Sequence, residues 1–553
     1  MSESYSIGLD YGTLSCRGII ADISDGTVVT EAEYVYPAGV MSRSLPDGEP
    51  LPSLYALQDP DDYVNALKSI VPTLMKQSRI SPDKIKAIGI DATSSTVIPV
   101  DSNFIPLCKL EKFRNNRHAW PKLWKHHASA YDAKLLTDKA KELCPEILED
   151  YGGIIGPENF LPKVMQTCRE APEVFEAAET FIEYSDYITS LLAGKEIRSG
   201  ATLSCKATWS PGRGYPDKEF FRAINPIYEN IPDKLMYHNG ASPLVVWPGE
   251  YAGKICMEMA DKLGLSENTI VTAPEMDAYA GIPGAGINSE GSMILMIGTS
   301  TGVMLLNKEK KTVPGICAMV ENSILPGYTN YAHGLPCVGD LFGWFIKNCV
   351  PKEYYEAAEK EGSGIHDYLS RLASEKAPGE TGIVALEWWN GEKLNPDLSG
   401  LILGMDLNTR PEDIYRALIE ATAFGTRRII EQYRKYGVVV NSVIACGGIA
   451  IKNAFLVQLY ADVLGLPVKV CRCTQTAALG AAMFAASAME NNRNIEKIIE
   501  KMAPENYTLY LPDCENNRKY DKLYSYYARL NELFSHENSI MAELKEIRNE
   551  GIK

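Results

Sequence analysis

The sequence predicts an α/β protein built from two large domains of similar design, followed by a helical extension. A chain of 553 residues is too long for one compact core, because domains usually hold roughly 100–200 residues. Hydrophobic residues make up 45% of the chain and charged residues 23%, which is enough apolar material for sizeable cores. The α/β class is indicated by a glycine-turn hairpin that occurs twice and by alternating strands and helices in the second half.

The repeated hairpin lies near the N-terminus and again half a chain later. In the first copy an apolar run over 7–11 precedes a turn at 12–15, after which the apolar run resumes. In the second copy an apolar run over 293–297 precedes a turn at 298–302 and a further apolar run. Chance similarity between two hairpins is the alternative. The spacing of 286 positions, close to half of the chain, favours two related domains.

Strands and helices alternate through the second half of the chain. Proline and acidic residues open a helix at 411, and Gly437 can end it. A short apolar strand over 443–446 comes next, then a helix at about 452–464 that glycine and proline stop. A strand over 468–470 and an alanine-rich helix from Thr474 to about Met489 complete the pattern.

A Pro/Gly-rich stretch at 283–288 predicts the junction between the domains. We therefore expect domains at 1–286 and 287–490 and a helical extension over 491–553. Within that extension, the spacing of five residues predicts that they share one face of a helix: Tyr524, Tyr526, Tyr527, Leu530 and Leu533.

The net charge of −16 makes nucleic acid and anionic membranes poor partners. No basic, apolar leader and no run of about 20 apolar residues occurs, so a cytoplasmic protein is expected. Thirteen scattered cysteines predict reduced thiols, and no zinc-binding pattern is present. An anionic ligand would have to be held locally, by backbone N–H groups, a metal ion and a few cations.

Three glycine-bearing turns, at 12–13, 298–300 and 447–448, are candidates for holding phosphate groups. Glycine lets a backbone approach a phosphate oxygen, and successive N–H groups with Thr or Ser hydroxyls supply donors. Each turn alone is more simply an ordinary tight turn. The three together favour a nucleotide, although neither a Walker pattern nor a complete dinucleotide-binding pattern is present.

The second turn also matches the G-x-S-x-G pattern of serine hydrolases, with Ser300 at the nucleophile position. That motif requires a helix directly after the serine. The apolar run over 303–306 predicts a strand instead, so a hydrolase is not favoured.

Two carboxylates are candidates for chemistry. Asp277 follows an apolar strand at 269–271 and lies at the expected start of a helix, where it suits either a catalytic base or a simple helix-capping role. Nearby Glu275 could equally be a solvated acid. Asp10 ends the first strand, where the second copy has Met296, and a hydrated cation fits there.

Two basic features have open interpretations. Lys206, a lone cation among small and apolar residues, either extends to solvent or donates to a ligand. The aromatic and basic stretch at 114–127 either packs along a helix face or lines a polar pocket.

Together these segments resemble the FGGY family of carbohydrate kinases, and within it the L-ribulokinases. The resemblance extends from about residue 5 to 485. It is carried by 8–13, 91–93, 120–127, 151–153, 276–278, 297–300, 388–391, 421–427 and 445–448.

The resemblance implies an actin-like fold of two ribonuclease-H-like domains with a cleft between them. The first domain would hold mainly the sugar and the second ATP. Asp277 matches the catalytic base of the family, and Asp10 matches the acid that holds hydrated Mg²⁺. Lys206 and the backbone near Ser94 match sugar-binding positions. The positions matched to ATP binding are Gly12, Thr13, Ser15, Gly298, Thr299, Ser300, Gly404, Gly447, Gly448 and Asn453.

One departure from the family concerns the sugar. L-ribulokinases typically have a sugar-binding glutamate where Ala332 stands and a glutamine where Leu335 stands, and alanine cannot accept those hydrogen bonds. Loss of such a contact can change specificity by orders of magnitude. Neighbouring His333 either supplies a substitute or only fills the space.

The expected activity is ATP- and Mg²⁺-dependent phosphorylation of a terminal hydroxyl of a ketopentose. The substrate would be L-ribulose or a related pentulose or polyol, of the xylulose, D-ribulose, ribitol or erythritol type. The alternative of another class is a non-catalytic actin-like protein that binds ATP without a sugar. A homodimer is left open.

Overall fold

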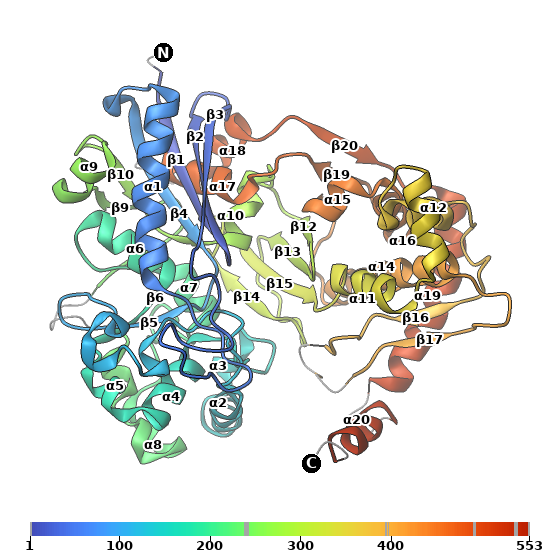
Figure 1. Cartoon of the computed structure of the whole chain (residues 1–553), viewed down its shortest axis with the longest axis horizontal. Coiled ribbons are helices and arrows are strands. Elements are labelled where there is room, and N and C mark those ends of the chain that lie inside the picture. The colour runs from blue at the N-terminus through green and yellow to red at the C-terminus, as the bar shows by residue number, and fades with distance from the viewer. Residues whose placement is uncertain are drawn as a thin grey trace. The chain divides into compact units, whose positions relative to one another are not determined.

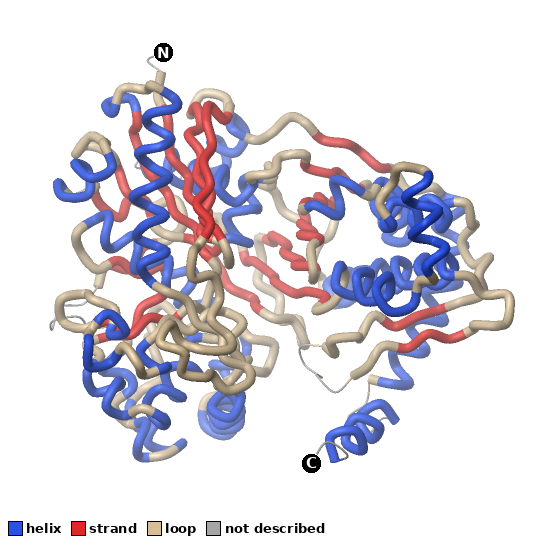
Figure 2. Tube along the Cα trace, viewed as in Figure 1, coloured by secondary structure: helices blue, strands red, loops and turns tan. Residues whose placement is uncertain are grey.

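The computed structural model describes residues 3–236, 243–392, 395, 398–489, 494–535 and 540–550. It forms two compact units whose chain segments are interleaved (Figure 1). The first unit contains Met1–Asn288, Ala318–Asn330 and Gln475–Pro504, and the second contains Ser289–Cys317, Tyr331–Thr474 and Glu505–Lys553. Each unit has its own sheet with helices packed on it (Figure 2).

The sheet of the first unit has the strand order β3-β2-β1-β4-β10-β9, and β11 also pairs with β4. β1 pairs antiparallel with β2 and parallel with β4, so the predicted first hairpin is confirmed. The strands are β1 (Tyr5–Tyr11), β2 (Ser15–Asp22), β3 (Val28–Val35), β4 (Ile85–Ala92), β9 (Tyr251–Lys254), β10 (Ile270–Thr272) and β11 (Glu275–Met276).

The sheet of the second unit contains the order β15-β13-β12-β18-β19-β20. β12 pairs antiparallel with β13 and parallel with β18, so its central strands repeat the arrangement of the first sheet. The two related α/β domains predicted from the repeated hairpin are therefore confirmed. The strands are β12 (Ser292–Ile297), β13 (Thr301–Asn307), β15 (Thr329–Leu335, its last five residues in this unit), β18 (Ser442–Cys446), β19 (Val468–Cys471) and β20 (Tyr507–Tyr510).

The helices of the first unit pack into several hydrophobic cores among the described residues. One core lies between α1 and the sheet, a second is made largely by helices of the region that follows β5, and a smaller one contains Ile197, Val246, Ala252 and Ala273. The helices are α1 (Pro60–Ser78), α2 (Ala130–Leu143), α3 (Glu146–Glu149), α4 (Phe160–Glu170), α5 (Pro172–Ala177), α6 (Tyr184–Ala193), α7 (Gly200–Lys206), α8 (Lys218–Ile224), α9 (Met257–Leu263), α10 (Asp277–Gly284), α17 (Thr476–Ala488) and α18 (Ile495–Met502). Shorter strands are β5 (Val97–Val100), β6 (Thr180–Glu183), β7 (Ile197–Ser199), β8 (Leu244–Val246) and β14 (Ala318–Glu321).

The second unit confirms most elements predicted for it. Helix α14 (Pro411–Lys435) starts at Pro411, where the Asp413 carboxylate accepts the Arg410 N–H at 2.8 Å, and Gly437 follows its end with φ of 78°. The other elements are α11 (Gly339–Cys349), α12 (Lys352–Lys360), α13 (Ile365–Ser374), α15 (Gly448–Lys452), α16 (Ala454–Leu464), α19 (Cys514–Phe534), α20 (Ile540–Glu550), β16 (Val384–Leu386) and β17 (Leu401–Leu403).

The prediction of a single helix at about 452–464 is wrong in one respect, because the helical conformation is interrupted at Asn453, between α15 and α16. Its backbone, with φ of −112° and ψ of 85°, is not helical. The Asn453 side chain instead accepts the Leu456 N–H at 3.0 Å and caps α16.

The predicted helical extension differs from the structure. α18 belongs to the first unit, and β20 continues the second sheet beside β19. On α19, Tyr524 and Tyr527 are buried, whereas Tyr526 and Leu533 are exposed, so the buried face is narrower than predicted. The boundary predicted between 490 and 491 lies outside the described residues. The division into domains at 1–286, 287–490 and 491–553 stays a prediction about independent folding.

Helix α17 packs on the first sheet and on α10 at distances that only glycine permits. A Cβ on Gly8 of β1 would lie 1.8 Å from the Ala478 carbonyl oxygen, and one on Gly89 of β4 would lie 2.2 Å from that of Ala481. Towards α10, a Cβ on Gly480 would lie 1.7 Å from the Ala280 carbonyl oxygen. This close packing explains why a segment from the predicted second domain joins the first unit.

In the described part of the chain, no helix combines the length and the apolar character needed to cross a membrane. No disulfide bond joins any of the thirteen cysteines, all of which lie within the described residues.

The α17 packing predicts that Gly8→Ala destabilises the first unit. The added methyl overlaps the backbone of α17, and overpacking of this kind costs about 1–3 kcal/mol. The measurement is the midpoint of thermal or urea-induced unfolding.

The matched control is Gly343→Ala on α11, where a Cβ meets nothing within 4 Å. Alanine is favoured over glycine in a helix by about 0.5–1 kcal/mol, so this variant should be at least as stable as the wild type. Equal stability of the two variants would contradict the packing argument.

Candidate functional site

Three carboxylates lie in register at one edge of the first sheet. Asp10 on β1 pairs with Asp91 on β4 in the parallel ladder, and Glu275 on β11 pairs with the same Asp91. Asp277, the first residue of α10, follows two residues after Glu275. The structure therefore brings the predicted residues Asp10 and Asp277 into one cluster within the first unit.

The electrostatics of the cluster bear on a role for Asp277 as a base. Burial, and next the negative charge of Asp10, raise the pKa of Asp277 to about 7. The Ala278 N–H donates to its carboxylate at 2.6 Å, and the ammonium of Lys206 also favours the ionised form. A carboxyl group with this pKa exchanges a proton near neutral pH, as a general base does.

Asp91 lies beside Asp10, and the side chains of these two residues interact through a hydrogen bond. Asp91 is fully buried, and apart from this contact its two oxygens receive no N–H or O–H hydrogen bond from the described residues. Burial, and next the charges of Asp10 and Asp277, raise its pKa well above the usual range. Like charges held together in a buried site require a shared proton or a cation.

Lys206, the last residue of α7, lies close enough to Asp277 for its charge to act on that carboxylate. It is only partly exposed. On the same helix the Cys205 thiol accepts the hydroxyl of Tyr279 at 3.6 Å, which links α7 to α10. Lys206 therefore lies near Asp277, and its role as a hydrogen-bond donor to a ligand stays a prediction.

The first glycine turn is closed by the Gly12 N–H, which donates to the Ser15 carbonyl at 3.0 Å. Gln58 donates to the Thr13 carbonyl at 2.8 Å, and the Trp124 indole N–H donates to the Thr13 hydroxyl at 3.1 Å. Because this hydroxyl accepts from Trp124, its own proton is available to a phosphate oxygen. Ser15 is engaged elsewhere, donating to Glu33 at 2.9 Å.

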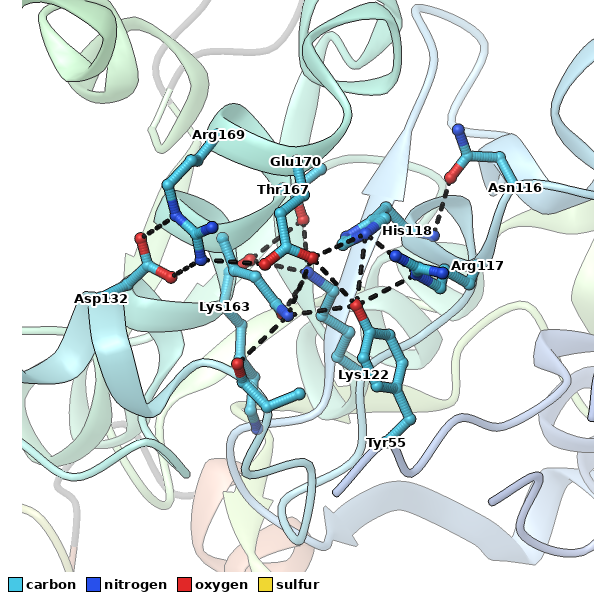
Figure 3. Close-up of polar contacts among 12 residues, drawn as sticks. Tyr55, Asn116, Arg117, His118, Lys122, Asp132, Lys163, Thr167, Arg169 and Glu170 are labelled. Carbon is cyan, nitrogen blue, oxygen red and sulfur yellow. Dashed lines mark hydrogen bonds and ion pairs between the residues drawn. The ribbon is translucent and has the colours of Figure 1, made fainter. Parts of the chain in front are cut away.

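The aromatic and basic stretch at 114–127 packs against helix α4. It contains one short 3₁₀ turn, Arg117–Ala119, and its buried polar groups bond to α4. Figure 3 shows Tyr55, His118, Lys122, Thr167 and Glu170 turned toward one another. Burial lowers the pKa of His118 to about 4. The hydrogen bond between His118 and Glu170 is the main reason that the pKa of Glu170 is lowered to about 2.

The second unit contains a pocket of about 720 Å³ that is lined by four of the ten residues predicted to bind the nucleotide. Its walls come from the turn after β12, the N-terminal ends of α11, α13 and α15, and Tyr415 of α14. Helix N-termini present N–H groups and favour negative charge. The predicted residues among its lining are Gly298, Thr299, Gly448 and Asn453.

The second glycine turn is fixed to the start of α11. The Val338 N–H donates to the Thr299 carbonyl at 2.8 Å, and the Gly339 N–H donates to the Gly298 carbonyl at 3.0 Å. Ser300 is exposed, and the strand β13 begins at the next residue. The absence of a helix after Ser300 confirms that this turn is not a hydrolase elbow.

The third turn joins β18 to α15. Gly447 has φ of 99°, and a Cβ there would lie 2.4 Å from the Ile297 carbonyl oxygen. At Gly448 a Cβ would meet nothing within 4 Å. The Asn453 side-chain amide donates to the Ser370 hydroxyl of α13 at 2.9 Å. The two glycines therefore have different functions, one in the fold and one at the pocket surface.

The structure does not place every predicted residue with these groups. Gly404 follows β17, has a φ of 101° and lines a separate pocket against α19. A side chain cannot be accommodated there, because a Cβ on Gly404 would lie 2.2 Å from the Gly382 carbonyl oxygen. Ala332 and His333 lie on β15, partly exposed, and His333 lines a cavity of about 150 Å³ with Glu387 and Arg428.

Sequence reasoning missed Asp91 and misjudged Glu275. Glu275 is not solvated: it is 1% exposed, its pKa is raised well above normal by burial, and it accepts the Met276 N–H at 2.7 Å. A signal for Asp91 was present, because residues 7–10 and 88–91 share the pattern Ile-Gly-x-Asp. In both segments the glycine faces α17 and the aspartate follows two residues later on the same face.

Two family models match the chain. The N-terminal domain of the FGGY family of carbohydrate kinases matches residues 5–284, and its C-terminal domain matches residues 293–489.

Individual proteins extend this match over nearly the full chain. A ribulokinase from Bacillus licheniformis is 41% identical over 544 residues, covering 97% of this chain and 98% of that protein. A ribulokinase from Geobacillus thermodenitrificans is 40% identical over 554 residues, covering 99% and 97%. Among solved structures, a xylulose kinase from Rhodospirillum rubrum superposes with a TM-score of 0.76 at 20% identity, covering 95% and 98%.

The different environments of Gly447 and Gly448 predict that Gly448→Ala weakens ATP binding without unfolding the protein. Its methyl group meets no protein atom but enters the pocket, which should raise the Kd for ATP by about tenfold or more. Gly447→Ala, the matched variant, should also lower the unfolding midpoint, because it combines a positive φ with overlap. Calorimetric titration measures the Kd for ATP, and thermal unfolding measures the midpoint. Wild-type ATP affinity in Gly448→Ala would contradict the assignment of the pocket to ATP.

Proposed function

Because the chain belongs to the FGGY family of carbohydrate kinases, we propose that it transfers the γ-phosphoryl group of ATP to the terminal hydroxyl of L-ribulose. The sugar is suggested by the ribulokinases, which share about 40% of their residues with this chain over almost their whole length. The chemistry is carried by one observation within the first unit, the meeting of Asp277, Asp10 and Lys206.

Asp277 is the base in this mechanism. It accepts the proton of the sugar hydroxyl as the oxygen attacks the γ-phosphorus, and the Ala278 N–H in the first turn of α10 holds its carboxylate in place. Lys206 donates a hydrogen bond to the sugar and keeps Asp277 from being fully neutralised. The backbone near Ser94, between β4 and β5, contributes the remaining contact of the first unit.

A magnesium ion fits the carboxylates of Asp10 and Asp91. Both are oxygen donors suited to a hard cation, and Asp91 has two buried oxygens that, apart from the contact with Asp10, have no hydrogen-bond partner among the described residues. When bound with ATP, the ion supplies positive charge that offsets the charge on the phosphate oxygens. Asp10 and Asp91 would hold it, directly or through its water ligands.

The second unit holds ATP in the 720 Å³ pocket. Gly448 leaves room for the nucleotide, and the N-termini of α11 and α15 favour its negative charge. The Thr13 hydroxyl of the first unit and the Thr299 region of the second are the phosphate-binding turns. Backbone donors of this kind allow a chain with a net charge of −16 to bind a nucleotide.

A second candidate substrate is favoured by Ala332. Glutamate at that position is typical of L-ribulokinases, and the methyl group of alanine cannot replace its hydrogen bonds. A related pentulose or polyol, of the xylulose, D-ribulose, ribitol or erythritol type, is therefore the alternative.

The proposal predicts that sugar stimulates ADP release. In a coupled ADP assay across L-ribulose, D-ribulose, xylulose, ribitol and erythritol, we expect L-ribulose to be turned over. Ala332→Glu should lower the KM for L-ribulose by about tenfold, because a hydrogen-bond acceptor is added, and should leave the KM for ATP unchanged. Ala332→Gln separates the effect of charge from that of size. ATP turnover indifferent to every sugar would instead indicate a non-catalytic ATP-binding protein.

The mechanism predicts that Asp277→Asn lowers kcat by about 10²–10⁴-fold while ATP binding persists, since only the base is lost. The exposed Asp83→Asn of the same unit is the control. In the wild type, kcat/KM for the sugar should fall as the pH drops below about 7, because Asp277 has a pKa of about 7 and its protonated form cannot accept a proton. Near-wild-type phosphorylation by Asp277→Asn would refute this role.

A further inference from the structure

A buried lysine ties helix α4 to the turn that joins β4 to β5. Lys163 of α4 is 0% exposed, and its ammonium group donates to the Ser95 carbonyl and, at 2.8 Å, to the Leu123 carbonyl. Both acceptors are backbone atoms outside α4. Hydrogen bonds from a charged donor in a buried site are among the stronger ones, so this lysine fixes two loops at once.

The turn held by Lys163 has a backbone conformation that needs support. Ser95 has φ of 61°, in the left-handed region that a residue with a Cβ adopts at a cost. It is 1% exposed, and its hydroxyl receives no hydrogen bond from the described residues, so its side chain does not hold the turn. Two side-chain hydrogen bonds to the backbone of this turn remain: the Lys163 ammonium donates to the Ser95 carbonyl, and the Thr96 hydroxyl donates to the Thr93 carbonyl at 3.5 Å. Of these two donors, only Lys163 comes from outside the turn.

Ser94, directly before Ser95, is the residue whose backbone the proposed function assigns to the sugar. The charge of Lys206 also acts on Lys163, which places the lysine near the sugar-binding side of the first unit. Burial lowers the pKa of Lys163 to about 7, and the Glu183 carboxylate opposes this shift. The cost of burying an ammonium group here is consistent with a role beyond packing.

We propose that Lys163 is a positioning residue, which holds the 93–96 turn in the conformation that binds the sugar. This inference rests on the proposed function, because it takes Ser94 as a sugar contact. Lys163 itself need not touch the substrate: it acts through the backbone of Ser95.

The chain offers a matched control in Lys122. This lysine is 2% exposed, and burial also lowers its pKa to about 7. Its ammonium donates to the Lys163 carbonyl, to Gln166 at 3.0 Å and to Thr167 at 2.7 Å, all on α4 (Figure 3). The Lys122 ammonium thus makes the same kind of buried contacts but makes none to the 93–96 turn.

The experiment compares Lys163→Met with Lys122→Met in the full chain. Two readouts are measured: hydrogen–deuterium exchange of a peptide that covers 93–97, and KM and kcat for L-ribulose and ATP. Lys163→Met should speed exchange in that peptide and raise the KM for the sugar by about tenfold or more, with the KM for ATP and kcat changed by less than about threefold. Lys122→Met should leave the exchange of this peptide and the sugar KM near wild type.

A rescue variant separates positioning from general loss of stability. Glycine accepts a positive φ without cost. Adding Ser95→Gly to Lys163→Met should therefore lower the raised KM for the sugar by about fivefold. Added to Lys122→Met, the same substitution should recover nothing.

Two results would overturn the inference: unchanged exchange at 93–97 in Lys163→Met, or equal effects of the two lysine variants on exchange and KM. If Lys163→Met does not fold, Lys163→Arg, which keeps the charge, replaces it in the same comparison. If the wild type phosphorylates no sugar, the proposed function fails, and the sugar-binding role of the turn fails with it. The exchange readout then still decides whether Lys163 holds the turn.

Discussion

The close packing of α17 is the constraint on which the catalytic cluster depends. Glycines on β1, β4 and α17 itself let the helix touch backbone on two sides, the sheet and α10. Asp10 and Asp91 follow Gly8 and Gly89 by two residues, and Asp277 begins the helix that α17 holds. A wider separation would move α10 away from the sheet and Asp277 away from Asp10. The small residues at these contacts therefore determine the distance between Asp277 and the carboxylates on the sheet.

The short distance between these acids costs free energy of folding, because buried carboxylates repel each other strongly. Parallel strands direct their carboxyl ends to one edge, which puts Asp10 and Asp91 side by side, and burial raises the pKa of both. The same arrangement gives Asp277 a pKa of about 7. Burial and like charge therefore favour the protonated forms of these carboxyl groups. The second unit has Met296 in the place of Asp10, and its pocket lies at the turn that follows β12.

Local patterns in the sequence predicted the elements that local chemistry determines. Both hairpins, the start of α14 at Pro411 and the end of α16 at Gly465 follow from turn and capping residues. The break at Asn453 was missed because a capping side chain inside an apolar run looks like a helical residue. The place of α17 in the first unit was missed because it depends on contacts between residues hundreds of positions apart. The Asn453 and Gly448 predictions nevertheless fall in one pocket, whereas the position of Gly404 depends on the path of the β16–β17 hairpin, which the sequence does not encode locally.

The late position of α17 in the chain has a consequence for synthesis. Some 470 residues separate Gly8 from Ala478, the residue it packs against. At roughly 5–20 residues per second, a ribosome needs about half a minute to a minute and a half to make that stretch. During this time one apolar face of the N-terminal sheet has no α17 to cover it. The N-terminal unit therefore cannot finish folding before α17 has been made.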